Sequence, residues 1–157
     1  LISLPPDWGY FVNRLSTHPV DEQGAIARQV IQAVGRDKST FIMSHSAGGI
    51  TASSLADEPN LGGIICFGYP FKHPNRDEES YRAEYLKKIQ IPFLIIQGTK
   101  DEYGGMDVQN RYELSPYIKF EFVEATHEYE NLSTEDWERV AHKIEAVLHT
   151  KQDSRSK

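Results

Sequence analysis

The sequence predicts an α/β fold with a mostly parallel sheet and helices on both faces. Short runs that are almost wholly apolar alternate along the chain with segments whose apolar residues recur every three or four positions. Such runs are typical of parallel strands buried on both faces, and the longer period indicates amphipathic helices that cover the sheet. The 157 residues suffice for one sizeable core. We therefore expect a single domain over residues 1–150 and a polar, disordered tail over 151–157.

The first elements follow a loop at residues 5–20 that is rich in proline and aromatic residues. Ile26, Val30 and Val34 recur every four residues, which predicts a helix over 21–34 that Gly35 ends. The pattern then predicts a short buried strand, a helix and a second apolar strand, over 40–43, 50–56 and 63–67.

The second half of the chain continues the alternation of strands and helices. The strand expected near residue 118 alternates apolar and charged residues, which indicates a half-exposed edge of the sheet. Ser133, with Asp136 three residues later, is typical of a capped helix start, and an apolar stripe follows. The expected elements are a helix over 81–89, a third strand over 92–98, a short helix over 106–114, a fourth strand over 118–123 and a last helix over 133–148.

The first strand runs directly into the small residues Ser44-His45-Ser46-Ala47-Gly48 before a helix begins. A nucleophilic serine on a tight strand-to-helix turn needs small neighbours two positions to either side, because the strand and the helix pack closely there. The run approaches Gly-x-Ser-x-Gly, with Ser44 in place of the first glycine. It predicts Ser46 as a nucleophile, although similar turns also form phosphate-binding loops and plain connections.

Candidate partners for Ser46 follow later strands, where ligand sites of parallel sheets lie. Asp101 follows the third strand and His127 the fourth. His127 can take the serine proton near neutral pH, and Asp101 can hold the imidazole tautomer. The backbone N–H of Ala47 is expected to be one oxyanion-hole donor. The alternatives are an Asp101 that only caps a turn, with Glu102 as the rival acid, and a His127 that is a surface histidine.

The composition argues against several classes of partner and site. The net charge of −6 disfavours nucleic acid and anionic membranes, and no apolar run approaches the roughly 20 residues that cross a bilayer. The single cysteine, Cys66, fits a reducing compartment, so we expect a cytoplasmic location, and its apolar surroundings favour buried packing. The spacing of histidines and acidic residues matches no zinc motif, so we expect no metal. Gly104-Gly105 is not followed by a phosphate-loop pattern, and no cofactor is expected.

The chain resembles the α/β-hydrolase superfamily, in particular its small dienelactone-hydrolase-like branch. The matching segments are 44–49, 68–71, 97–104 and 126–128. The resemblance implies a serine hydrolase with a Ser-Asp-His triad that cleaves an ester, thioester or lactone of a small substrate through an acyl-enzyme. Acyl transfer and a catalytically inactive scaffold or interaction module are the alternatives. Aromatic residues near the strand ends either line an acyl pocket or cover the core, among them Tyr10, Tyr69 and Phe71.

The chain departs from this family in two ways. Ser44 replaces a glycine, and family members have several strands and a helix before the region that begins here. One loop of that region carries the second oxyanion N–H, and only residues 1–4 resemble the end of such a strand. We therefore expect an N-terminally truncated chain, either a fragment or one that pairs with another chain. An apolar sheet edge beside the nucleophile strand would favour a homo-oligomer.

Overall fold

The fold is taken from a computed structural model, which describes residues 20–35 and 37–150. The strand end expected at residues 1–4, the aromatic loop with Tyr10 and the tail at 151–157 lie outside the described residues. The elements in chain order are α1 (Val20–Val34), β1 (Thr40–His45), α2 (Ala47–Ser54), β2 (Leu61–Phe67), β3 (Phe93–Gly98), α3 (Val108–Arg111), β4 (Ile118–Val123) and α4 (Thr134–His149).

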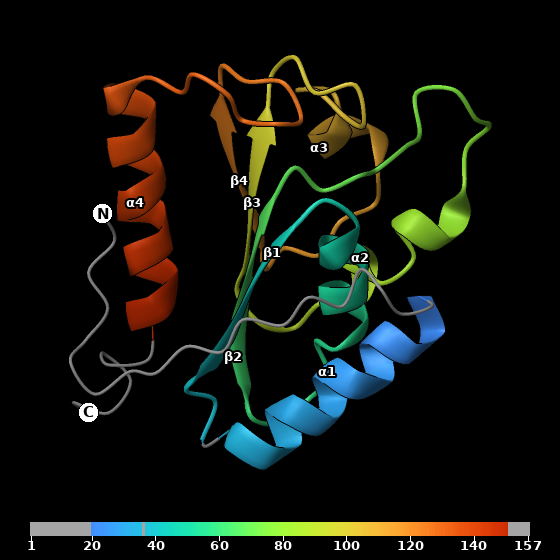
Figure 1. Cartoon of the computed structure of the whole chain (residues 1–157), viewed down its shortest axis with the longest axis vertical. Coiled ribbons are helices and arrows are strands. Elements are labelled where there is room, and N and C mark those ends of the chain that lie inside the picture. The colour runs from blue at the N-terminus through green and yellow to red at the C-terminus, as the bar shows by residue number, and fades with distance from the viewer. Residues whose placement is uncertain (1–19, 36, 151–157) are drawn as a thin grey trace.

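The four strands form one parallel sheet in the order β1-β2-β3-β4 (Figure 1). Each strand pairs with the next strand along the chain, so their C-terminal ends lie side by side along one edge of the sheet. Within the described residues, β1 and β4 are the outer strands. The predicted fold class, a parallel sheet with helices on both faces, is confirmed.

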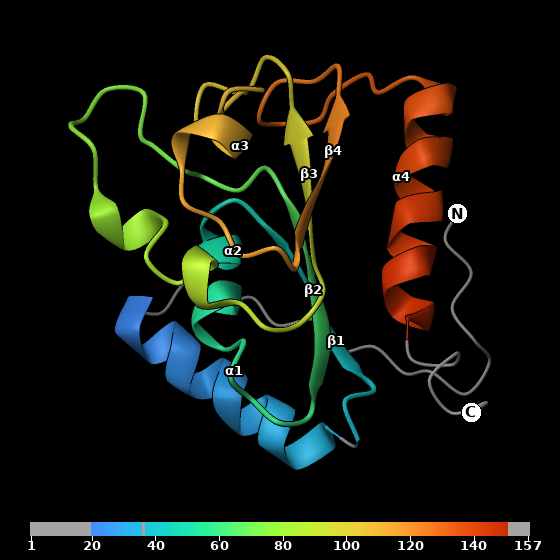
Figure 2. The same ribbon diagram turned by 180° about the vertical axis from the view of Figure 1, so that it is seen from behind.

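Helices cover both faces of this sheet. α4 lies on one face, and α1, α2 and α3 lie on the other, as Figures 1 and 2 show. Side chains alternate between the two faces along each strand, and this alternation divides the core. Ile64 and Ile95 pack on the side of α2, whereas Ile65 and Ile96 pack against the buried residues of α4. Those residues are Val140, Ile144 and Leu148.

The helix predicted over 81–89 is wrong. The structure has two short 3₁₀ turns there, Ser80–Arg82 and Leu86–Lys88. An α-helix would pair the carbonyl of Arg82 with the N–H of Leu86, but that carbonyl accepts from the hydroxyl of Tyr69, and the N–H of Leu86 donates to the carbonyl of Ala83. Ser115 donates to the carbonyls of Leu86 and Ile89 at the end of the segment. The helix predicted over 106–114 is confined to α3, and no helix of the part described is long and apolar enough to cross a membrane.

Cys66 lies fully buried in β2, on the side of the sheet that α2 covers. Burial raises the pKa of its thiol to about 12, because the charged thiolate is disfavoured away from water. This position agrees with the prediction, made from the apolar residues around Cys66, that its side chain packs in the core.

Candidate active site

Ser46 occupies the turn between β1 and α2 in a backbone conformation that L residues rarely adopt. Its φ is 53° and its ψ is −128°, and holding a residue in such a region costs about 1–3 kcal/mol. The N–H of Ser46 donates to the carbonyl of Phe67 at 3.0 Å, and its own carbonyl accepts from the N–H of Gly49 at 2.8 Å. Bonds to β2 and to α2 therefore hold the strained turn in place.

α2 begins at Ala47, immediately after this turn, rather than at residue 50 as predicted. The first N–H groups of a helix have no acceptor within the helix. The backbone N–H of Ala47 is therefore available beside the Ser46 hydroxyl, and the helix dipole favours negative charge at that position. Ala47 is exposed.

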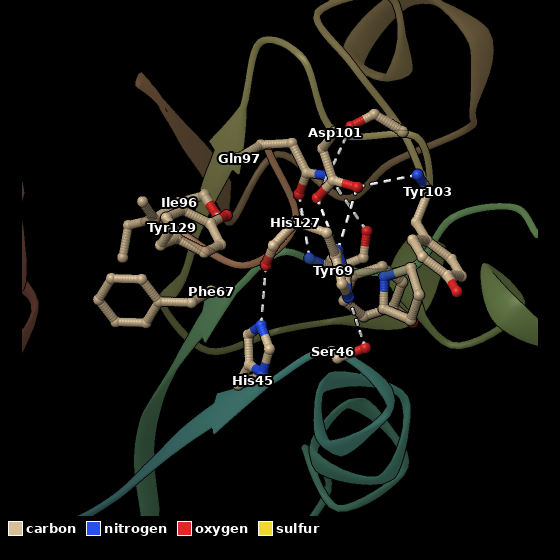
Figure 3. A network of polar contacts seen from close by, with 12 residues as sticks. His45, Ser46, Phe67, Tyr69, Ile96, Gln97, Asp101, Tyr103, His127 and Tyr129 are labelled. Carbon is tan, nitrogen blue, oxygen red and sulfur yellow. Dashed lines mark hydrogen bonds and ion pairs between the residues drawn. The ribbon is translucent and has the colours of Figure 1, made fainter. Parts of the chain in front are cut away.

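The three residues predicted from the strand ends lie in contact. Oγ of Ser46 is 2.7 Å from Nε2 of His127, and Nδ1 of His127 is 3.0 Å and 2.9 Å from Oδ1 and Oδ2 of Asp101. Figure 3 shows the imidazole between the hydroxyl and the carboxylate. A carboxylate only accepts hydrogen bonds, so Nδ1 carries the proton of the neutral imidazole and Nε2 can accept the proton of the hydroxyl.

The surroundings favour a strongly basic imidazole. The side chain of Asp101 is fully buried, and His127 is 8% exposed. The hydrogen bond that His127 donates to Asp101 raises the pKa of His127 above its usual value, and burial acts in the opposite direction. The charges of Asp101, Glu128 and Glu102 also raise this pKa. Glu102, the rival acid, is exposed. The structure thus places Asp101, and not Glu102, against the histidine.

Comparison with known protein families and structures places this arrangement in context. A family model described as an alpha/beta hydrolase domain matches residues 13–153. The chain belongs to this α/β hydrolase family. Comparison with curated protein sequences gave no match. The finer assignment to a dienelactone-hydrolase-like branch stays a prediction.

Solved structures share the fold of this α/β hydrolase at low sequence identity. The esterase domain of a Rhodothermus marinus protein has a TM-score of 0.59 at 15% identity, with 84% of this chain and 69% of that one covered. A serine hydrolase involved in carbazole degradation has a TM-score of 0.61 at 14% identity, with 94% and 75% covered. An esterase of Pyrococcus furiosus has a TM-score of 0.61 at 14% identity, with 83% and 62% covered.

Small residues surround the turn of this α/β hydrolase because there is no room for larger ones. A Cβ on Gly49 would lie 2.4 Å from Sγ of Cys66, and a Cβ on Gly48 would lie 3.3 Å from Cβ of Ser44. Ser44, the departure from the glycine pattern, is accommodated because its Oγ turns toward β2 and donates to the carbonyl of Ile65 at 3.3 Å.

Two of the predicted substrate-binding residues, Tyr69 and Phe71, lie in the core and not at an open surface. Tyr69 and Phe71 are fully buried in the core on the side of α2, with ring centroids 4.8 Å apart. The hydroxyl of Tyr69 donates to the carbonyl of Arg82. Their position therefore agrees with the alternative in which these aromatic residues cover the core. Tyr10 lies outside the described residues.

Three residues to which the sequence assigns no catalytic role contact His127. The ring of Tyr103 lies 4.4 Å from that of His127, and Nε2 of His45 lies 3.1 Å from the His127 carbonyl oxygen. Gly68, at a φ of 61°, passes beside the imidazole. A positive φ is not visible in a sequence, but a glycine directly after a buried strand is a signal that could have drawn attention to Gly68.

Two surface hollows flank the site, and neither is lined by Ser46. One lies beside β1 and α4 and is lined by Met43, Ser44, His45, Phe67, Glu128, Tyr129 and Trp137. The other is polar and is lined by Lys100, Glu124, Ala125, Thr126, Glu130, Asn131, Ser133 and Asp136. Within residues 20–35 and 37–150, no group of histidine, cysteine and acidic side chains could hold a metal ion.

Proposed function

We propose that this α/β hydrolase domain is a serine hydrolase that cleaves an ester, thioester or lactone of a small substrate through an acyl-enzyme. One observation carries the proposal: Ser46 sits at a strained strand-to-helix turn with its Oγ 2.7 Å from Nε2 of His127. A hydroxyl becomes a useful nucleophile when a positioned base takes its proton. The similar structures named above are two esterases and a serine hydrolase, which agrees with this class.

The first half of the reaction forms the acyl-enzyme. His127 takes the hydroxyl proton while Oγ of Ser46 bonds to the substrate carbonyl carbon, and the carbonyl electrons move to its oxygen. The N–H of Ala47 donates to this oxyanion; one such donor is worth about 10²–10³ in rate. When the carbonyl re-forms, the bond to the alkoxide or thiolate breaks, and His127 gives its proton to the leaving group.

The second half returns the enzyme to its starting state. Water loses a proton to His127 and attacks the acyl carbon, a second oxyanion forms, and its collapse breaks the bond to Oγ. His127 then returns the proton to Ser46, and the carboxylic acid leaves. Each turnover consumes one water and one ester bond. An alcohol or amine that replaced the water would give acyl transfer with the same residues.

Asp101 supports the imidazole in both halves. Its carboxylate accepts from Nδ1 of His127, which fixes the tautomer and stabilises the imidazolium that forms when Ser46 is deprotonated. The alternative of an inactive scaffold would be favoured by an Asp101 side chain turned toward solvent. That side chain is fully buried, which supports the hydrolase over the scaffold on this point.

A fluorophosphonate probe tests the proposal because it reacts covalently with activated serines. We expect stoichiometric labelling of the native chain at Ser46, located by peptide mass spectrometry, and no labelling of Ser46→Ala. Ser44→Ala is the matched control, since it removes a hydroxyl two residues away whose bond goes to the Ile65 carbonyl. A folded native chain that stays unlabelled, or that is labelled at another serine, would contradict the proposed function.

A further inference from the structure

Gln97 is a fully buried polar residue near the end of the otherwise apolar strand β3. It follows the apolar residues 93–96, and its exposed fraction is 0%. Burying an amide costs free energy unless its oxygen and nitrogen both find hydrogen-bond partners. The bonds that Gln97 makes therefore indicate its role, and an amide inside an apolar run is the sequence signal that marks it.

The amide of Gln97 first joins β3 to the chain that leaves β2. Backbone bonding between these strands ends where the N–H of Gly68 donates to the carbonyl of Ile96 at 2.9 Å. Beyond that point, Oε1 of Gln97 accepts from the N–H of Tyr69 at 3.0 Å, and its Nε2 donates to the Tyr69 carbonyl at 3.3 Å. The side chain thus supplies the next pair of bonds where the two backbones separate.

The same nitrogen also reaches the loop that carries the acid. Nε2 of Gln97 lies 2.6 Å from the carbonyl oxygen of Gly104 and 3.2 Å from Oδ2 of Asp101. Its two hydrogens are shared among three acceptors, so the donor capacity of the amide is fully used. Gly104 closes the turn by donating to the Asp101 carbonyl at 3.2 Å. Gln97 therefore contacts both ends of the acid loop, residues 101–104, and Figure 3 shows Gln97 beside Asp101.

We propose that Gln97 is a positioning residue that holds the Asp101 carboxylate in the plane in which it meets His127. Besides His127, the carboxylate accepts from the N–H of Tyr103 at 2.8 Å and from Gln97. Tyr103 belongs to the acid loop itself and would move with it. Among the described residues, Gln97 is the donor that ties the carboxylate to the sheet. This inference rests on the proposed function, because the orientation of the acid matters when His127 is the base.

The substitution Gln97→Met tests this role, since methionine has a similar length and no donor. An unfixed carboxylate would stabilise the imidazolium less, so we expect the pKa of His127, measured by NMR titration, to fall toward about 6.5. Glu102 and Glu128, the other charges that act on His127, are unchanged. The rate of Ser46 labelling by a fluorophosphonate should fall about 10²-fold, the effect of small misplacements at a catalytic group.

Ser115→Ala is the matched control for the loss of a buried hydrogen bond. The Ser115 hydroxyl donates to the carbonyl of Ile89, away from the acid, so its loss should leave the pKa of His127 and the labelling rate unchanged. Gln97→Asn keeps an amide that is one carbon shorter, and we expect about a tenfold loss of labelling. If Gln97→Met does not fold, Gln97→Asn is measured in the same two ways.

The outcomes separate this inference from the proposed function. A folded Gln97 variant with the native pKa of His127 and the native labelling rate would overturn the positioning role. If the native chain is not labelled at Ser46 but Gln97→Met still lowers the pKa of His127, the proposed function fails and the positioning role stands. A fall in both the pKa and the labelling rate, absent in Ser115→Ala, supports both.

Discussion

The backbone of Gly68 lies directly against the imidazole of His127. A Cβ on Gly68 would lie 3.1 Å from Nδ1 of His127 and 3.3 Å from Oδ2 of Asp101. The imidazole cannot retreat without losing its bond to Ser46, and the carboxylate cannot retreat without losing its bond from Gln97. The φ of 61° also strains any residue other than glycine. We therefore expect the site to require glycine at this position.

We predict that Gly68→Ala lowers Ser46 labelling by a fluorophosphonate about 10²-fold, because the added methyl group displaces the base. Gly24→Ala is the control: it lies in α1, and its added Cβ would approach the Oγ of Ser54 no closer than 4.0 Å. It should keep the native labelling rate and add about 0.5–1 kcal/mol to the free energy of unfolding. Native labelling by Gly68→Ala would show that the imidazole has room to move.

We expect residues 44 and 48 to be coupled, since a Cβ on Gly48 would lie 3.3 Å from that of Ser44. Ser44→Gly alone should keep activity, because the hydroxyl bonds to the Ile65 carbonyl and not to the triad. Gly48→Ala should reduce the free energy of unfolding more in the native chain than in Ser44→Gly, with a coupling of about 1 kcal/mol. Urea unfolding of the four proteins measures it; additive effects would rule out the contact.

The pH dependence of activity should reflect the raised pKa of His127. The base accepts a proton only when neutral, so the labelling rate should rise with pH through that pKa, with a midpoint above about 6.5. The main cause of the raised pKa is the hydrogen bond that His127 donates to Asp101. Asp101→Asn should therefore move the midpoint to lower pH and reduce the plateau by about 10³–10⁴. A native midpoint below 6.5 would contradict this.

His45 should contribute a smaller effect through the backbone of the base. A carbonyl oxygen only accepts, so Nε2 of His45 donates to the carbonyl of His127 at 3.1 Å. Losing one such bond costs about 0.5–1.5 kcal/mol, and we expect His45→Ala to slow labelling about 3- to 10-fold. His45→Gln should recover part of the loss, and His142→Ala, on the exposed side of α4, should have no effect. If His142→Ala slowed labelling by as much as His45→Ala, the effect of the His45 substitution would be nonspecific.

The start of α4 offers a prediction about stability alone. The N–H of Asp136 donates to Oγ of Ser133 at 3.1 Å, which caps α4 on the opposite face of the sheet from α2. Ser133→Ala should lower the free energy of unfolding by about 1 kcal/mol. Ser133→Asp should preserve it, because aspartate also caps helices. Both should label at the native rate, and a slower rate would link α4 to the site.

The proximity of Ser46, Asp101 and His127 could be predicted from the sequence because parallel strands bring distant residues to one edge. Ser46, Asp101 and His127 each follow an apolar run, and the C-terminal ends of β1, β3 and β4 lie along the same edge of the sheet. Knowing which strands the runs form is enough to place the three residues near one another. The distances among them depend on the loops, which a periodic pattern does not specify.

Other features depend on contacts between residues far apart in sequence. The tyrosines at 81 and 85 suggest a helix face, but the backbone there bonds to Tyr69 and Ser115 instead. For Tyr69 the sequence predicts either substrate binding or a place over the core. Its burial depends on how the loop after β2 folds back. Aromatic residues near a strand end look the same in sequence in both cases.

The single thiol of the chain lies beneath the turn that carries Ser46. Sγ of Cys66 fills the space beside Gly49 of α2, and the thiol is fully buried with a pKa of about 12. A maleimide or disulfide reagent reaches it when the packing around the thiol opens, as it would if α2 separated from β2. The rate at which this thiol is modified in the native chain therefore reports how often the region around Ser46 opens. Such opening can be followed without introducing a further cysteine.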